Sequence, residues 1–498
     1  MERAPRSQIP HEPSPGLSPA AVAALFGAVL VVVAWPAQPS AVGLAWVVGF
    51  AVVVSGAFHA AYRAGALLTA LFVALYALVY AIGLGDAVIH GVRRSGLLAP
   101  AASTREAVAL VALFIASTTL VALVTRRRGA AAGRASVTPS VLVGFVVIVA
   151  AATVAAFGTG AWTNWGGGGG APDQAAGGLR LELLYPALLF ATVGLVALAP
   201  AARDRRLRLL RIGVGLGLAL LVFALQSRRM MFACAALTAL AALRFPSASL
   251  HHLMKRHRGF PLRVAAVGVP LVVALVVALI ASSGWRAAAS HGQVELAAGL
   301  RSALSAATTP ESFDTGTVEE RLTYLWMDGI AIELADTLGV ELDVTAALET
   351  SLLLAVPSAL YGGKSRLRRV TCEEPMAGAG VDNDLPCTAT AEAYLGLGAA
   401  GVALIALLWG LYIALAERLL AHQGALARVA GLVLFAPVTT IETGLFPMSQ
   451  GVRGALLVVL GTLALSILAA AALRGLGRGS LPIATPELPG ATSEQGPR

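Results

Sequence analysis

Two adjacent arginines separate two short apolar runs near the middle of the chain. Arg228 and Arg229 lie between the 14-residue runs 212–225 and 230–243. As helices, such runs reach about 21 Å, whereas the hydrocarbon core of a bilayer is about 30 Å thick. We expect both arginines below the outer membrane surface, where they either bind an internal acid or an anionic ligand or extend to lipid headgroups. Phosphate suits them, because a guanidinium group binds two oxygens at once and keeps its charge.

A second basic group lies in a long segment that is expected to face the outside of the membrane. It follows Pro357 and Tyr361 and consists of Lys364, Arg366, Arg368 and Arg369. Lys and Arg are usually retained on the cytoplasmic side, so an anionic partner should favour these residues outside. A lipid diphosphate and anionic headgroups both fit that description.

Carboxylates that could act as a general base precede the tenth apolar run. They are Asp382, Asp384 and Glu392. A hydroxyl nucleophile needs such a base to accept its proton. His291 is an alternative base, whereas Glu442 is expected to pair with an arginine such as Arg453.

Cys372 and Cys387 are the cysteines of the outer segment, with fourteen residues between them. In an oxidising compartment a disulfide between them would contribute about 3 kcal/mol by the chain-entropy model, and two free thiols are the alternative. The sequence has no phosphate-binding Gly-Lys-Ser/Thr loop and no His-Glu-x-x-His motif, so ATP hydrolysis and metalloprotease chemistry are unsupported. We predict no metal and no cofactor.

These residues must be positioned by membrane helices. The chain has 498 residues, of which 57% are hydrophobic and 13% charged, whereas soluble domains carry about 25% charge. Soluble enzymes, coiled coils and disulfide-rich secreted modules are therefore excluded. The predicted fold is an all-α polytopic membrane protein with about twelve spans, at about 20–35, 41–60, 65–85, 105–124, 139–160, 183–201, 209–225, 230–245, 262–283, 395–416, 427–446 and 453–473.

Charge is segregated along the chain in a way that predicts orientation. Residues 286–392 contain sixteen Asp and Glu against seven Lys and Arg, so the rest of this +9 chain carries +18. Such segregation indicates a membrane orientation with both termini in the cytoplasm, and no nucleic-acid partner. The expected organisation is a cytoplasmic tail (1–18), nine spans (19–284), a large external loop with short helices (285–393), three spans (394–474) and a second cytoplasmic tail (475–498). One of the loop helices is predicted at 318–338, where apolar residues recur among acids.

One stretch carries a resemblance to a known family. Residues 391–401 (Ala-Glu-Ala-Tyr-Leu-Gly-Leu-Gly-Ala-Ala-Gly), followed by Trp409 and Gly410, resemble the Glu-x-Tyr and Gly-x-x-Gly signature of Wzy-type oligosaccharide repeat-unit polymerases. Residues 354–357 (Leu-Ala-Val-Pro), with Tyr361 and Lys364 after them, are similar to another segment of that family. The Ser227-Arg228 turn is similar as well. Ser358 and Ser365 depart from the pattern, where an arginine and a proline are expected.

The resemblance implies a metal-independent membrane glycosyltransferase of the bacterial inner membrane with a GT-C-like fold. Such a polymerase moves a growing O-antigen or exopolysaccharide chain from undecaprenyl diphosphate onto the next lipid-linked repeat unit, beside membrane lipids, a flippase and a chain-length regulator. Glu392 or Asp384 would be the catalytic base. The residues expected to bind the lipid-linked donor and acceptor are Arg228, Arg229, Arg321, Tyr361, Lys364, Arg366, Arg369, Tyr394 and Arg453.

Other membrane functions remain open at this point. An O-antigen ligase uses the same donor and relies on an external histidine, for which His291 is the candidate. A polysaccharide flippase or transporter is a second alternative, although the large loop after the ninth span breaks the two-half symmetry of twelve-span transporters. A structural or signalling membrane protein is a third.

Overall fold

The computed structural model describes residues 18–94, 97–126, 324–343, 387–422, 425–435 and 459–472, together with isolated residues elsewhere. This part of the chain is mostly helical. Three of its helices, Ala41–Ala64, Ala101–Thr125 and Ala389–Ala421, are long and apolar enough to cross a membrane, and a bent pair makes a fourth candidate span. The prediction of a mostly helical protein with apolar helices of membrane-spanning length is therefore confirmed, whereas the number of about twelve spans stays a prediction.

The first two helices match the predicted apolar runs closely. α1 (Pro19–Ala34) and α2 (Ala41–Ala64) each begin after a serine. The Ser18 hydroxyl accepts a hydrogen bond from the backbone N–H of Ala21, and the Ser40 hydroxyl accepts one from that of Gly43, both at 3.1 Å. Such N-caps satisfy backbone N–H groups that lack a partner within the helix. α2 ends at Gly65, whose φ of 67° is a left-handed conformation that favours glycine.

The third apolar run is divided into two helices. α3 (Leu67–Ala81) and α4 (Leu84–His90) meet at an angle of 50°, and Gly83 between them has a φ of 68°. A short antiparallel hairpin follows, made of β1 (Val92–Arg94) and β2 (Leu97–Ala99). The sequence did not predict this hairpin, which leads into the long helix α5 (Ala101–Thr125).

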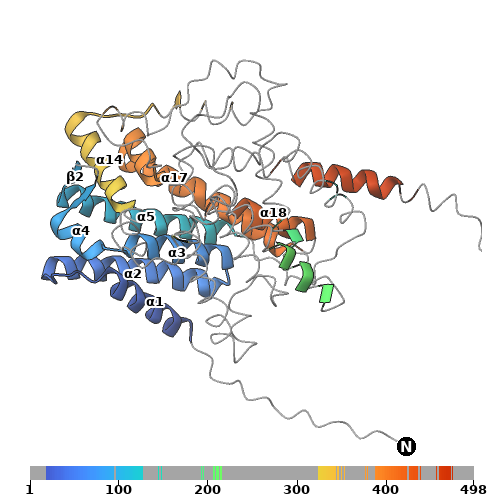
Figure 1. The fold of residues 1–498 in the computed structure, drawn as a ribbon, viewed down its shortest axis with the longest axis horizontal. Coiled ribbons are helices and arrows are strands. Elements are labelled where there is room, and N and C mark those ends of the chain that lie inside the picture. Colours follow the sequence, from blue (N-terminus) through green and yellow to red (C-terminus); the bar gives the residue numbers. More distant parts are fainter. Residues whose placement is uncertain are drawn as a thin grey trace, which may run out of the picture.

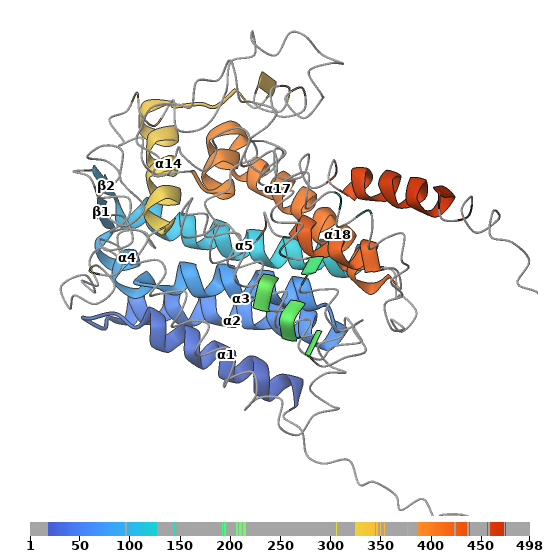
Figure 2. The same ribbon diagram turned by 45° about the vertical axis from the view of Figure 1, so that its right-hand side comes forward.

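The predicted loop helix is present from Tyr324 onward as α14 (Tyr324–Leu338), and residues 318–323 lie outside the described part. Leu325 and Ile332 are buried as its apolar pattern predicts, whereas Leu338 is 65% exposed at the end of the helix. α14 is not among the candidate spans. It lies across the first turns of α5 and α17 (Ala389–Ala421), near α4 and the hairpin (Figures 1 and 2).

α17 begins before the predicted run 395–416 and is broken near its start. Leu397 and Gly398 have non-helical angles, and the pair φ 60°, ψ −147° at Gly398 is accessible mainly to glycine. The break frees the carbonyl of Leu395, which accepts a hydrogen bond from the backbone N–H of Leu342 at 2.8 Å. The helix after the break, 399–421, is about 34 Å long, so it is long enough to cross a bilayer without the residues before the break.

Aromatic side chains fill the interior between α3, α5 and α17. Phe72, Tyr76, Phe114 and Trp409 contact one another with ring centroids 4.6 to 6.3 Å apart. Figures 1 and 2 show α5 and α17 side by side along this core. α18 (Ala425–Phe435) and a further apolar helix, Val459–Ala472, complete the described elements.

At the far end of this core, side chains from neighbouring helices satisfy helix termini. Arg126 donates to the carbonyl of Ala64 at 2.8 Å and to that of Gly65 at 3.1 Å, which caps the end of α2. Glu417 accepts from the backbone N–H of Thr69 at 3.1 Å in the first turn of α3, a helix without a cap of its own. These contacts hold the ends of α2, α3 and α17 together.

Candidate functional site: a buried carboxyl group

The carboxyl group of Asp328 is buried where α14, α17 and α3 meet. Asp328 of α14 is 3% exposed, and its flanking residues 325–332 are otherwise apolar. Its Oδ1 atom accepts hydrogen bonds from the hydroxyls of Thr388 and Thr390, the latter at 2.6 Å. Its Oδ2 atom is buried and has no hydrogen-bond partner among the described residues. One oxygen is thus held in place, and the other has an unused acceptor site.

The residues that hold Asp328 are positioned by the start of α17. Thr388 is the N-cap of that helix, and its hydroxyl accepts from the backbone N–H of Ala391 at 3.0 Å while it donates to Asp328. The hydroxyl of Tyr80, from α3, lies 3.4 Å from the Thr390 hydroxyl. The site therefore depends on three segments that are far apart in the sequence.

Burial dominates the electrostatics of this group. Desolvation raises the pKa of Asp328 to about 6, against the opposing hydrogen bonds from Thr388 and Thr390. Asp328 has no ion pair in the part of the chain that the structure describes. A carboxyl group with this pKa is mostly ionised at neutral pH, yet it accepts a proton far more readily than an exposed aspartate.

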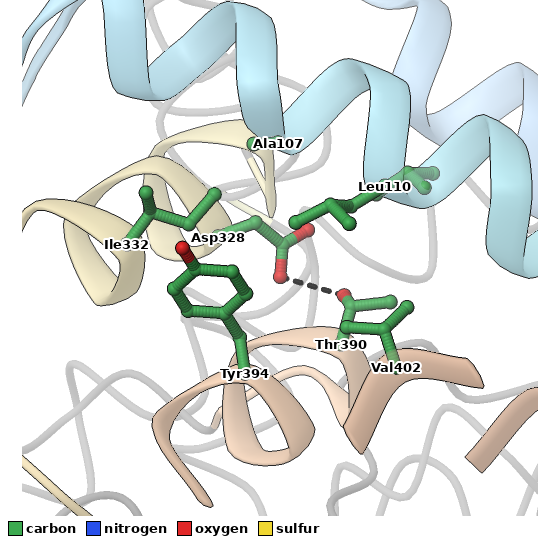
Figure 3. Close-up of a pocket in the computed structure, with 8 residues that line it drawn as sticks. Ala107, Leu110, Asp328, Ile332, Thr390, Tyr394 and Val402 are labelled. Carbon is green, nitrogen blue, oxygen red and sulfur yellow. Dashed lines mark hydrogen bonds between the residues drawn. The ribbon is translucent and has the colours of Figure 1, made fainter. Parts of the chain in front are cut away.

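A small hollow adjoins Asp328. Its volume is about 10 Å³, and it is lined by Ala107, Leu110, Val111, Asp328, Ile332, Thr390, Tyr394 and Val402. This is room for about one water molecule, for which the free carboxylate oxygen would be a polar partner. Figure 3 shows the carboxyl group of Asp328 between the α5 side chains and the ring of Tyr394.

Tyr394 links the hollow to an acidic rim on the surface. Its hydroxyl lies 3.2 Å from Glu106 Oε1 and 3.4 Å from Asp336 Oδ1, and both of these acids are exposed. Beside them, the Ser103 hydroxyl donates to Glu333 at 2.6 Å. The first turns of α5 and the face of α14 thus present three carboxylates above the buried one.

Three of the residues predicted from the sequence lie in or beside this region. Glu392 is 2% exposed in the first turn of α17, and Tyr394 lines the hollow. Cys387 is disulfide-bonded, but Cys372 and Cys234 are not described, so the pairing with Cys372 stays a prediction. The other predicted site residues lie outside the described part: Asp384, Arg228, Arg229, Arg321, Tyr361, Lys364, Arg366, Arg369 and Arg453.

Asp328, Glu106 and Asp336 were not predicted from the sequence. A local signal existed for Asp328, because it is the one charged residue in 324–332, and such an isolated acid is costly to bury. Glu106 and Asp336 carry no such signal. They come together only because α5 and α14 cross beside Tyr394.

The arrangement can hold and move a proton beside a ligand rich in hydrogen-bond donors. The described residues contain no group of three or more His, Cys, Asp or Glu placed to hold a metal ion. No protein-family model, curated protein or solved structure matches the chain. The function must therefore be inferred from this site and from the sequence.

Proposed function

We propose that the protein is a polysaccharide polymerase, a membrane glycosyltransferase that joins lipid-linked repeat units. The main support for the proposal is Asp328, a buried carboxyl group with a raised pKa whose Oδ2 atom has no partner among the described residues. It lies beside a hollow lined by Tyr394, whose hydroxyl is near two exposed acids. A general base works best when its pKa is near the working pH. The family resemblance of residues 391–401 supports the same conclusion, since this stretch includes Tyr394 at the hollow.

The charges at the two ends of the described bundle support an orientation with the site outside. The end that holds Asp328 contains eight acidic residues: Asp86, Glu106, Asp328, Glu333, Asp336, Glu341, Asp343 and Glu392. Against them stand Arg93, Arg94 and Arg105. The opposite end contains Arg63, Arg126, Arg418 and Arg428 with one acid, Glu417. By the positive-inside rule the second end is cytoplasmic, as in the proposed twelve-span protein of the bacterial inner membrane with cytoplasmic termini.

The proposed reaction is an inverting glycosyl transfer. The acceptor hydroxyl loses its proton to Asp328 Oδ2, either directly or through one water molecule in the hollow. The acceptor oxygen forms a bond to the anomeric carbon of the donor glycan as the bond from that carbon to the diphosphate oxygen breaks. Undecaprenyl diphosphate leaves with the bonding electron pair. In this scheme Asp328 takes the role that the sequence assigned to Glu392 or Asp384.

The leaving diphosphate carries negative charge that must be stabilised. The arginines and the lysine predicted for this purpose, above all Arg228, Arg229 and Lys364, lie beyond the described residues and keep that role as part of the proposal. Arginine would serve here without a change of protonation, because its pKa stays far above the working pH.

A deletion strain tests the proposed function. Loss of a polymerase leaves glycans capped with a single repeat unit, and the gene restores long chains when it is returned. The readout is the length distribution of the extracted polysaccharide. Accumulation of long lipid-linked polymer in the deletion strain would instead identify a ligase.

The same buried carboxyl group supports a second candidate, a proton-coupled flippase. Protonatable groups near broken helices are typical of transporters, and α17 is broken at Leu397 and Gly398 near Asp328. The deletion experiment separates the two functions. A flippase mutant retains single repeat units on the inner face of the membrane, whereas a polymerase mutant exports them.

A further inference from the structure

We infer that Glu106, Tyr394 and Asp336 form the subsite that binds the sugar of the acceptor through its hydroxyl groups. The inference rests on the proposed function, because it assigns the acceptor of that reaction to a place on the surface. Glu106 comes from α5, Asp336 from α14 and Tyr394 from α17. Their convergence is a product of the fold rather than of any local sequence.

The two carboxylates near Tyr394 share one hydroxyl donor, which favours a ligand that brings further hydrogen-bond donors. The tyrosine hydroxyl has one proton, but two carboxylate oxygens lie near it, at 3.2 and 3.4 Å. It can donate to only one of them at a time. Neither Glu106 nor Asp336 has an ion pair within the described residues. At least one carboxylate is therefore open to a further donor.

The buried carboxyl group gives an independent reason to place a ligand here. Asp328 is 3% exposed, its Oδ2 atom lacks a partner, and it lines the same hollow as Tyr394. Burial of a carboxylate is costly, so its position beside the hollow favours a hydroxyl group or a water molecule that approaches from the surface. A sugar held by Glu106 and Asp336 would have its ring over Tyr394 and one hydroxyl directed to the hollow.

Sugar hydroxyls fit this rim better than a metal ion does. Among the described residues no three acidic or metal-binding side chains are close enough to hold a metal. Two carboxylates near one tyrosine hydroxyl instead match a ring with several hydroxyl donors, and each such bond to a charged group contributes to affinity. The ligand class is thus a glycan with free hydroxyl groups.

The test measures binding and transfer separately with the full-length protein in lipid nanodiscs. The binding probe is the repeat-unit oligosaccharide, released by mild acid from the glycolipid of the deletion strain. Glu106→Gln and Asp336→Asn should each weaken its binding about tenfold, the loss expected for one charged hydrogen bond. Glu341→Gln is the matched control, because Glu341 is an exposed acid that follows α14, and it should bind as the wild type does.

The outcomes separate the inference from the proposed function. If the wild type elongates glycans but the two variants bind the oligosaccharide as tightly as Glu341→Gln does, the subsite is wrong and the polymerase stands. If the wild type fails to bind the oligosaccharide, the subsite is also wrong. If binding falls in the two variants but the wild type never elongates a lipid-linked unit, the sugar subsite stands and the proposed polymerase is wrong.

Discussion

Replacement of Asp328 by asparagine should abolish glycosyl transfer and, at neutral pH, raise the free energy of unfolding. Desolvation raises the pKa of this carboxyl group from 3.8 to about 6, which corresponds to about 3 kcal/mol at 1.36 kcal/mol per pH unit. Asparagine has nearly the same shape and its Oδ1 can accept the same two threonine hydroxyls. Its amide N–H groups would face the hollow, where a water molecule can accept a hydrogen bond from them.

The sign of the effect follows from proton linkage. Below about pH 4 the group is protonated in both the folded and the unfolded state, so its ionisation costs nothing. Between about pH 4 and 6 the folded state binds more protons than the unfolded state, and the free energy of unfolding falls as the pH rises. Above about pH 6 the full cost of about 3 kcal/mol is present. Asp328→Asn cannot ionise and escapes this loss.

The assay is thermal unfolding in detergent across this pH range, together with transfer activity. The unfolding temperature of Asp328→Asn, relative to the wild type, should rise by a few degrees from about pH 4 to about pH 7. Activity should be lost at every pH. Glu341→Gln should show neither effect, since Glu341 is exposed. Parallel pH profiles for the wild type and Asp328→Asn would refute the reasoning, because they would mean that Asp328 does not ionise at a cost.

Two further predictions concern the helices that position the site. A Cβ atom at Gly401 would lie 2.1 Å from the carbonyl oxygen of Ala393, so Gly401→Ala should displace the first turns of α17 and lower the free energy of unfolding by about 2 kcal/mol, measured by thermal unfolding. The control is Gly49→Ala, whose new Cβ would meet nothing within 4 Å and which should be neutral or slightly stabilising. Equal losses of stability in both variants would contradict the packing argument. Glu417→Ala should lower the free energy of unfolding by about 2 kcal/mol, because the backbone N–H of Thr69 loses its hydrogen-bond acceptor. Glu417→Gln keeps an acceptor oxygen and should cost less than half as much. Equal unfolding temperatures for these two variants would show that the cap contributes little.

Hydropathy predicts the long apolar helices of the fold. α1, α2 and α5 match the predicted runs within a few residues, because each is a continuous apolar stretch of nearly the length that a bilayer needs. α17 starts six residues before its predicted run, at Ala389. Thr390 and Glu392 lower the hydropathy of that first turn, although it continues the same helix.

The bends and the site could not be predicted in this way. The angle between α3 and α4 and the break in α17 depend on the left-handed conformations of Gly83 and Gly398, and glycine occurs at 53 positions in this chain. The isolation of Asp328 in the apolar stretch 324–332 marks it as unusual but does not show how it is buried. Its burial depends on Thr390 and Tyr80, which are distant in the sequence, and no local pattern contains that information.

As the proposed general base, Asp328 must act in the reaction that joins lipid-linked repeat units. The most direct measurement incubates the purified protein in nanodiscs with the undecaprenyl-diphosphate-linked unit from the deletion strain and follows product mass over time. The wild type should give a ladder of products that differ by one repeat unit, and Asp328→Asn should slow its formation by at least about a hundredfold. An equal rate for both proteins, or no ladder with the wild type, would contradict the account.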